Sequence, residues 1–281
     1  MNTTLILLDV DGTLIDTRYN LNTSDSEWKA ALRRAEAQGA VIGLNSDSAC
    51  EMLRRKARFY GIRGPIVAER GALVAESPNA STICTNPAAL RFLELRNAFL
   101  QFLTTGEPLA TYLTVVGHVN ELSNLLPTLP EEACVNEAAV LINGFRSCSL
   151  SFFVRKREGA RWFKDVRALD EVIAIVHSLG CGEKFPSLWD ERDMDRDPNY
   201  GICIFHHKQS VKSLACAPLL QLFGERRIFM VGNSMSDYMG EGGIIHCAVG
   251  NASKEYKEHS VFVAKGERTQ GVIELFERIL A

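Results

Sequence analysis

Two aspartates follow a short apolar segment near the start of the chain, and their type and spacing suggest acid–base and metal chemistry. Asp9 and Asp11 come directly after four consecutive aliphatic residues, 5–8. Two residues apart on an extended chain, their side chains can point to the same side. Because a pair of acids is costly to bury without a cation or a shared proton, we expect one beside them. Gly12 permits a tight turn whose backbone N–H groups could receive an anion. The alternative is a solvated Asp–Gly turn.

A second polar cluster follows another apolar segment, 228–231, far along the chain. It comprises Gly232, Asn233, Ser234, Met235, Ser236 and Asp237. If the two apolar segments are neighbouring strands, Asn233 and Asp237 face the first pair of acids. Carboxylate, amide and carbonyl oxygens, completed by water and phosphate, suit Mg²⁺. The alternative is that Ser236 or Asp237 only caps a short helix. The predicted metal ligands are therefore Asp9, Asp11, Asn233 and Asp237.

Alternating strand and helix patterns at both ends of the chain predict the sheet that positions these residues. In the first third, strands are expected at 4–9, 40–44, 65–68 and 72–75, with helices at 28–38 and 48–59. The last third predicts helices at 210–223 and 270–280 and strands at 227–231, 244–249 and 261–264. Such alternation is typical of a parallel sheet with right-handed crossovers.

The middle of the chain differs, because one of its segments alternates with a period of two. Residues 147–155 partly alternate apolar and polar side chains, which favours a sheet with one solvated face. Further strands are expected at 112–116, 139–142 and 201–205, and helices from residue 86 and over 164–179. The predicted domains are a core of 1–82 and 199–281, interrupted by an α+β cap of 83–198.

The segment from Asp9 to Leu14 reads Asp-Val-Asp-Gly-Thr-Leu and resembles the first motif of the haloacid dehalogenase-like (HAD) phosphohydrolases, D-x-D-G-T. The family's second motif has Ser46 as its candidate, with Asn45 as an alternative register. The lysine of its third motif matches Lys212 best, with Lys208 as the alternative. Residues 64–73, 248–253 and 269–272 also resemble members with a large cap between the second and third motifs.

This resemblance implies a Rossmann-like α/β core with an inserted cap, and a role for each motif residue. Asp9 would form an aspartyl-phosphate, and Asp11 would act as general acid and base. Mg²⁺ is the implied cofactor, offsetting the repulsion between Asp9 and the phosphate. The predicted phosphate-binding residues are Ser46, Lys212, Asp47 and Gly12.

Two positions depart from the family pattern. Asn233 stands where the fourth motif usually has an acid, so it supplies an oxygen ligand without negative charge. Residues 45–48 replace the Thr-Gly-Arg that large-capped relatives carry in the second motif, which removes an arginine. Neither change removes the nucleophile or the acid–base residue.

Composition excludes several classes of protein. The 281 residues are 46% hydrophobic, and 31 basic residues against 34 acidic ones give a net charge of −3. Disorder, nucleic-acid binding and a membrane surface are therefore not expected. No apolar segment reaches the length of a membrane span, and acids interrupt the apolar start before a secretory leader could form. Eight scattered cysteines without zinc spacing predict reduced thiols and a cytoplasmic location.

The resemblance thus implies a Mg²⁺-dependent phosphatase that acts on a small phosphorylated metabolite, and within this family a sugar phosphate is the expected substrate. The basic residues of 155–161, in the cap, could bind a second anionic group. A phosphomutase of the same superfamily would use the same aspartates and lysine. Because Asn233 replaces an acid, a non-catalytic phosphate-binding or regulatory module is the third reading.

Overall fold

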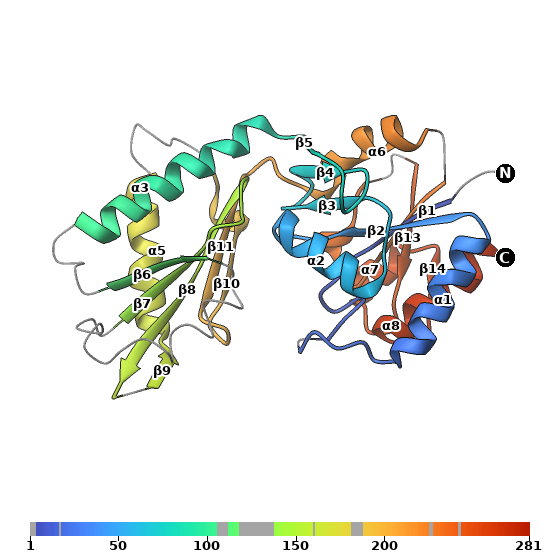
Figure 1. Ribbon diagram of the computed structural model, residues 1–281, viewed down its shortest axis with the longest axis horizontal. Helices are drawn as coiled ribbons and strands as arrows, with labels where there is room; N and C mark the ends of the chain where they lie inside the picture. The colour runs from blue at the N-terminus through green and yellow to red at the C-terminus, as the bar shows by residue number, and fades with distance from the viewer. Residues whose placement is uncertain are drawn as a thin grey trace. The chain divides into compact units, whose positions relative to one another are not determined.

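The structure of the protein is a computed structural model, shown in Figure 1, and it describes residues 4–16, 18–105, 112–117, 138–159, 161–180, 188–224, 227–240 and 243–281. The chain divides into two compact units. The core unit consists of Met1–Thr85 and Ser210–Ala281, and the cap unit consists of Asn86–Gln209.

The core unit is built on an eight-stranded sheet with the strand order β14-β13-β12-β1-β2-β3-β4-β5. Its strands are β1 (Thr4–Leu8), β2 (Ala40–Asn45), β3 (Ile66–Ala68), β4 (Leu73–Ala75), β5 (Thr82–Cys84), β12 (Ile228–Gly232), β13 (Ile244–Ala248) and β14 (Phe262–Val263). The six strands from β14 to β3 are parallel, whereas β4 and β5 are antiparallel additions. All residues of β1 and β12 are buried, as expected for central strands covered on both faces.

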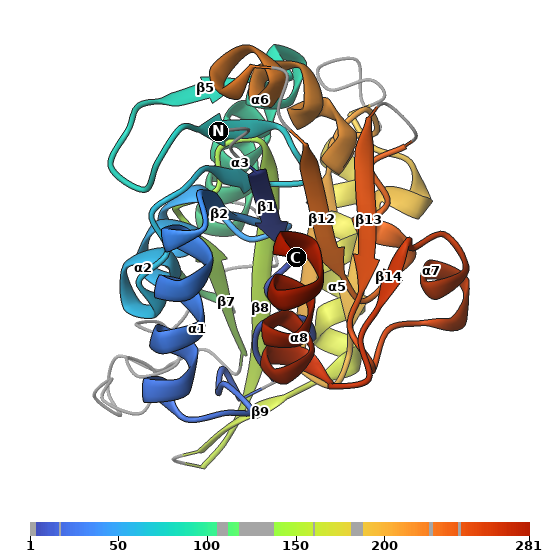
Figure 2. The same cartoon turned by 90° about the vertical axis from the view of Figure 1, so that its right-hand side faces the viewer.

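Helices of the core unit come from both ends of the chain: α1 (Asp25–Ala37), α2 (Cys50–Tyr60), α6 (Cys216–Phe223), α7 (Lys254–Glu258) and α8 (Arg268–Leu280). Figure 2 shows α1 and α8 side by side in front of the core sheet, where the rings of Trp28 and Phe276 lie 6.0 Å apart. Leu219 of α6 packs in one cluster with Leu5 and Leu7 of β1. The predicted α/β class with a parallel-rich sheet is confirmed.

The cap unit is a second sheet with helices packed on it. Its strands are β6 (Tyr112–Gly117), β7 (Ala138–Asn143), β8 (Ser149–Glu158), β9 (Arg161–Lys164), β10 (Met194–Asp197) and β11 (Ile202–His206), ordered β10-β11-β8-β7-β6 with β9 beside β8. Helices α3 (Arg91–Thr105) and α5 (Val166–Gly180) bury Phe99, Leu169 and Val172 against Phe152 of β8 (Figure 1). Among the described strands of the cap unit, β6 and β7 pair in parallel and the other pairs are antiparallel.

Strand β11 lies outside the 83–198 range that the sequence suggested for the cap. Its hydrogen-bonded partners are β8 and β10, so pairing places it in the cap unit, which extends to Gln209. The range 83–198 as the limits of a separate domain stays a prediction.

Within the described ranges, every helix is too short or too polar to cross a lipid bilayer. The cysteines of these ranges are free thiols: Cys50, Cys84, Cys148, Cys203, Cys216 and Cys247. Cys134 and Cys181 lie outside the described residues.

Candidate active site

The carboxyl ends of β1, β2 and β12 form the edge of the core sheet where the candidate residues gather. Leu8, the last residue of β1, pairs with Leu44 of β2 on one side and Val231 of β12 on the other. The predicted proximity of the apolar segments 5–8 and 228–231 is therefore confirmed. The backbone N–H of Asp9 donates to the carbonyl of Val231, 2.9 Å away, which fixes the start of the loop that carries both acids.

Lys212 connects two of the candidate aspartates. Its Nζ lies 3.0 Å from Oδ1 of Asp9 and 2.6 Å from Oδ1 of Asp237. All three side chains are less than 10% exposed, so this ion cluster is shielded from water. Of the two lysines the sequence offered, Lys212 is the one at the sheet edge, whereas Lys208 belongs to the cap unit.

A turn of three residues with positive φ supports the segment that carries Lys212. Glu69, Arg70 and Gly71 have φ values of 49°, 56° and 82°. A Cβ on Gly71 would lie 2.5 Å from the carbonyl oxygen of Val211, so the backbone before Lys212 approaches as closely as only glycine allows. This turn brings residues 64–73 into contact with the backbone around Lys212, although the two segments lie far apart in sequence.

Burial dominates the electrostatics of the cluster. The pKa of Asp9 is raised to about 7: burial is the largest cause, Lys212 acts in the opposite direction, and the charges of Asp237 and Asp11 add to the rise. Burial alone would lower the pKa of Lys212, but attraction to Asp9 and Asp237 outweighs it, so the net shift is upward. The lysine therefore stays charged between the two buried aspartates.

Asp237 shapes the loop after β12. Its Oδ2 accepts hydrogen bonds from the backbone N–H groups of Asn233 (2.8 Å) and Ser234 (3.0 Å), while its Oδ1 binds Lys212. A Cβ on Gly232 would lie 2.4 Å from this carboxylate, which accounts for the glycine. Both oxygens of Asp237 thus already have partners in the protein.

The first loop and the end of the chain hold each other. Nδ2 of Asn251 donates to the carbonyl of Gly12 (2.8 Å), and Oγ1 of Thr269 donates to the carbonyl of Leu14 (2.6 Å). The N–H of Gly12 donates to the carbonyl of Ile15 (2.9 Å), so it closes the turn and does not face outward as an anion donor, contrary to the sequence expectation. The C-terminal segments therefore position the loop that carries Asp9 and Asp11.

Asn233 lies directly over Gly12. A Cβ on Gly12 would meet Nδ2 of Asn233 at 2.4 Å, and the φ of Gly12 is +85°. A glycine is therefore required at this position, both for the turn and for the side chain that crosses it.

Asp11 differs from Asp9 in exposure and in its partner. Its side chain is 57% exposed, and its Oδ1 lies 3.3 Å from Nζ of Lys56 in α2. Among the described residues, the oxygens of Asp9, Asp11 and Asp237 do not converge on one point. The structure thus brings Asp9 and Asp237 together through Lys212 and leaves Asp11 facing Lys56. The sequence did not predict Lys56 as a site residue.

The residues at the end of β2 and directly after it divide between the interior and the sheet edge. Nδ2 of Asn45 lies 3.3 Å from the sulfur of Met239 in the interior, whereas Oγ of Ser46 accepts from the N–H of Ser48 at 3.2 Å. Asp47 pairs with Arg70 at 3.4 Å. A carboxylate repels phosphate, so Asp47 could contribute only its backbone N–H. Ser46 stays the predicted phosphate ligand of this segment.

The donor set of the sheet edge fits a divalent cation. Asp9, Asp11 and Asn233 offer carboxylate and amide oxygens, the ligands that Mg²⁺ prefers. Burial is the main cause of the raised pKa of Asp9, because it disfavours the charged carboxylate. A cation bound beside Asp9 would stabilise that charged form, and the four predicted ligands stay predictions.

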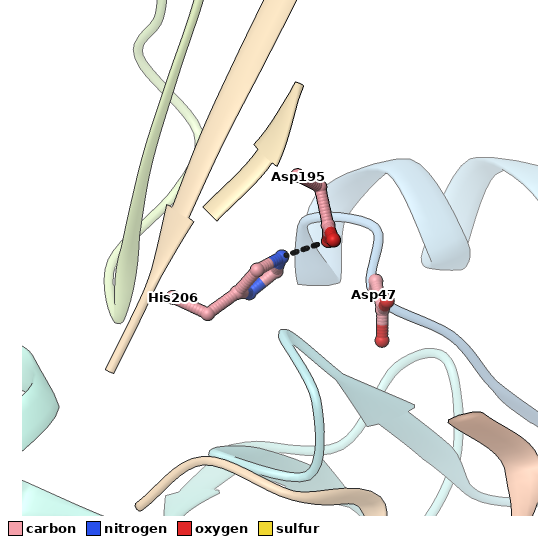
Figure 3. A group of neighbouring side chains, drawn as sticks. All are labelled: Asp47, Asp195 and His206. Atoms are coloured by element: carbon pink, nitrogen blue, oxygen red, sulfur yellow. Dashed lines mark ion pairs between the residues drawn. The ribbon is translucent and has the colours of Figure 1, made fainter. Parts of the chain in front are cut away.

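In the cap unit, a buried histidine forms the one ion pair drawn in Figure 3. His206 of β11 lies with Nε2 3.2 Å from Oδ2 of Asp195 in β10. Asp47, also drawn there, belongs to the core unit. The guanidinium of Arg155 donates to the carbonyls of Val154 and Gly201, so this member of the basic group is engaged within the cap.

Comparison with curated proteins gives one relative that matches nearly the whole chain. A phosphoglycolate phosphatase of Sulfolobus acidocaldarius is 24% identical, over 98% of this chain and 96% of the relative. No family model matches.

Solved structures of the same fold also span the whole chain. A haloacid dehalogenase-like hydrolase of Bacteroides thetaiotaomicron superposes with a TM-score of 0.63 at 16% identity, covering 99% of both chains. A sugar phosphatase of HAD subclass IIB gives 0.54 at 13% identity, again over 99% of both.

Proposed function

We propose that the chain is a phosphoric monoester hydrolase of the haloacid dehalogenase-like superfamily and that it hydrolyses a small phosphorylated metabolite through an aspartyl-phosphate on Asp9. The observation that carries the proposal is the buried cluster in which Lys212 contacts both Asp9 and Asp237. Burying three charges is costly, so such a cluster at a strand edge is typical of a catalytic site.

In the proposed first step, a carboxylate oxygen of Asp9 attacks phosphorus, and the bond from phosphorus to the leaving oxygen breaks. Asp11 gives its proton to that oxygen, so the alcohol leaves neutral. In the second step, Asp11 takes a proton from water, whose oxygen attacks phosphorus and releases inorganic phosphate and free Asp9. The two steps restore both aspartates.

Phosphate oxygens gain charge during each transfer, and positive groups must lie beside them. The ammonium of Lys212 is the buried cation next to Asp9, and Ser46 supplies a hydroxyl at the adjacent strand end. Mg²⁺ held by Asp9, Asp11, Asn233 and Asp237 would supply the remaining positive charge.

The relatives indicate which substrates to test first, and the cysteines bear on the cellular location. Phosphoglycolate and sugar phosphates are the substrates to test first, because the relative from Sulfolobus and the subclass IIB structure carry those names. Free thiols at all described cysteines support a cytoplasmic location.

A screen of phosphate monoesters with and without Mg²⁺ tests the proposal. We expect Mg²⁺-dependent release of inorganic phosphate from at least one substrate, lost in Asp9→Asn and kept in Asp25→Asn, an exposed aspartate of α1. Absence of turnover across the panel would contradict the proposal and favour a phosphate-binding module. Transfer to a second substrate hydroxyl instead of water would identify a phosphomutase.

A further inference from the structure

Lys56 is a nearly buried lysine beside the proposed active site, and the reaction described above does not use it. Its side chain is 12% exposed, and its Nζ lies 3.3 Å from Oδ1 of Asp11, 45 residues away in sequence. Burying an ammonium group carries a large desolvation cost unless an anion lies beside it. In the part of the chain that the structure describes, Asp11 is the carboxylate that meets it.

The surroundings of Lys56 hold its ammonium in place. Its Nζ lies 5.3 Å from the centre of the Tyr19 ring, in the geometry of a cation–π contact. The hydroxyl of Tyr60, one turn further along α2, donates to the carbonyl of Tyr19 at 3.0 Å. Trp28 in turn donates its ring N–H to the carbonyl of Tyr60, 2.8 Å away. Three aromatic residues thus link α1, α2 and the loop after Asp16.

Two other basic residues of α2 form ordinary solvent-exposed ion pairs. Arg55 and Arg58 both contact Glu51 at 3.4 Å, and their side chains are 46% and 53% exposed. These pairs are local to the helix and solvated, so each is worth little. Lys56 differs in being buried and in reaching a distant loop, which points to a specific task.

We propose that Lys56 is a positioning residue for Asp11: its ammonium donates to Oδ1 of Asp11 and holds the carboxyl group where it exchanges protons with the leaving oxygen and with water. The inference rests on the proposed role of Asp11 as general acid and base. Lys56 does not touch the phosphate in this account. Its contribution is to keep a side chain that is more than half exposed from rotating away.

The dependence of rate on the leaving group tests this inference. An alkyl phosphate needs a proton on its leaving oxygen, whereas p-nitrophenolate leaves as a stable anion. Correct general-acid catalysis is worth about 10²- to 10⁴-fold. We expect Lys56→Met to lower kcat/KM for the alkyl phosphate about tenfold more than for p-nitrophenyl phosphate. Because both substrates are measured on one preparation, the ratio does not depend on how much protein is folded.

Further variants separate positioning from a general structural effect. Lys56→Arg keeps the charge and should retain the wild-type ratio, and Lys29→Met, an exposed lysine of α1, should not change it. In an Asp11→Asn background the effect of Lys56→Met on the ratio should vanish, because the two residues act as one unit. If Lys56→Met does not fold, Lys56→Gln takes its place.

Equal losses on both substrates, or a change in the ratio that persists without Asp11, would overturn the inference. That outcome leaves the proposed function standing as long as Asp9→Asn still abolishes turnover. Retention of turnover in Asp9→Asn would overturn the proposed function itself.

Discussion

Ion pairs in the core unit and in the cap unit have similar lengths but very different surroundings. In the core unit, Lys212 binds Asp9 and Asp237 at 3.0 and 2.6 Å, with all three side chains less than 10% exposed. In the cap unit, Arg196 binds Asp170 at 2.8 Å, with side chains 33% and 54% exposed. Distance alone would rank these interactions as equals.

Burial separates them. Breaking a buried pair leaves an uncompensated charge in a medium of low polarity, whereas water replaces the lost partner of an exposed pair. The interior of the cap unit is held by apolar side chains of α3, α5 and β8 instead. We infer that the core cluster serves chemistry and that the cap pair is an ordinary surface interaction. Substitutions in both units test that difference.

The largest effect is expected from Lys212→Met. Without its ammonium, Asp9 and Asp237 are two buried acids side by side, and the free energy of unfolding should fall by about 3–5 kcal/mol. Denaturant unfolding at neutral pH in the presence of a chelator measures this. A loss below about 1 kcal/mol would show that the buried cluster contributes no more to the free energy of unfolding than an exposed ion pair does.

Asp9→Asn should stabilise the protein when divalent cations are removed. Burial raises the pKa of Asp9 from 3.8 to about 7, so between these values the folded state binds more protons than the unfolded state. Stability contributed by the protonated form is complete below pH 4 and is lost as pH rises through 7.

The difference between the variant and the wild type should therefore grow with pH, to about 2 kcal/mol in favour of Asp9→Asn at pH 8. Lys212 keeps Asp237 as its partner in this variant. Thermal unfolding at pH 5 and pH 8 with a chelator measures the effect, with Asp25→Asn as the exposed control. A variant less stable than wild type at pH 8 would contradict the electrostatics described above.

Asn233→Asp should strengthen Mg²⁺ binding about tenfold, because it adds a negative charge beside Gly12 in the loop of the proposed ligands. Titration calorimetry with Mg²⁺ alone gives the affinity directly. Asn199→Asp in the cap unit is the matched control and should leave the affinity unchanged. Equal affinities for wild type and Asn233→Asp would remove Asn233 from the ligand set.

The smallest effect is expected from Arg196→Ala in the cap unit. Its pair with Asp170 is exposed, so the free energy of unfolding should change by less than about 1 kcal/mol, and less still in high salt. A loss as large as that of Lys212→Met, measured in the same denaturant series, would show that burial does not separate the two units.

Sequence patterns were sufficient for the sheet edge but not for all its contacts. Apolar segments that end in acids predict β1 and β12 and bring Asp9 together with Asp237, because buried parallel strands have a distinctive composition. They do not distinguish Lys212 from Lys208. That choice depends on the close approach of Gly71 to the backbone before Lys212.

Lys56 and Gly12 show two further limits of the sequence. Lys56 lies in α2 between Arg55 and Arg58, whose side chains are exposed. At such a position in an amphipathic helix, the sequence predicts a solvated lysine. Its ammonium instead contacts Asp11 and the ring of Tyr19, both of which lie in the loop region after β1. The N–H of Gly12 was expected to face an anion but closes a turn to Ile15, a bond that composition does not reveal.

Detection of the phosphorylated enzyme tests the central claim most directly. The protein is mixed with Mg²⁺ and a substrate that it hydrolyses, and the reaction is quenched in acid within milliseconds. The quenched protein is then digested and examined by mass spectrometry. We predict one added phosphoryl group on the peptide that contains Asp9. Borohydride should reduce the resulting aspartyl-phosphate to homoserine at position 9, and Asp9→Asn should show neither product. Phosphate release without any phosphorylated peptide, or phosphorylation at another residue, would contradict the account.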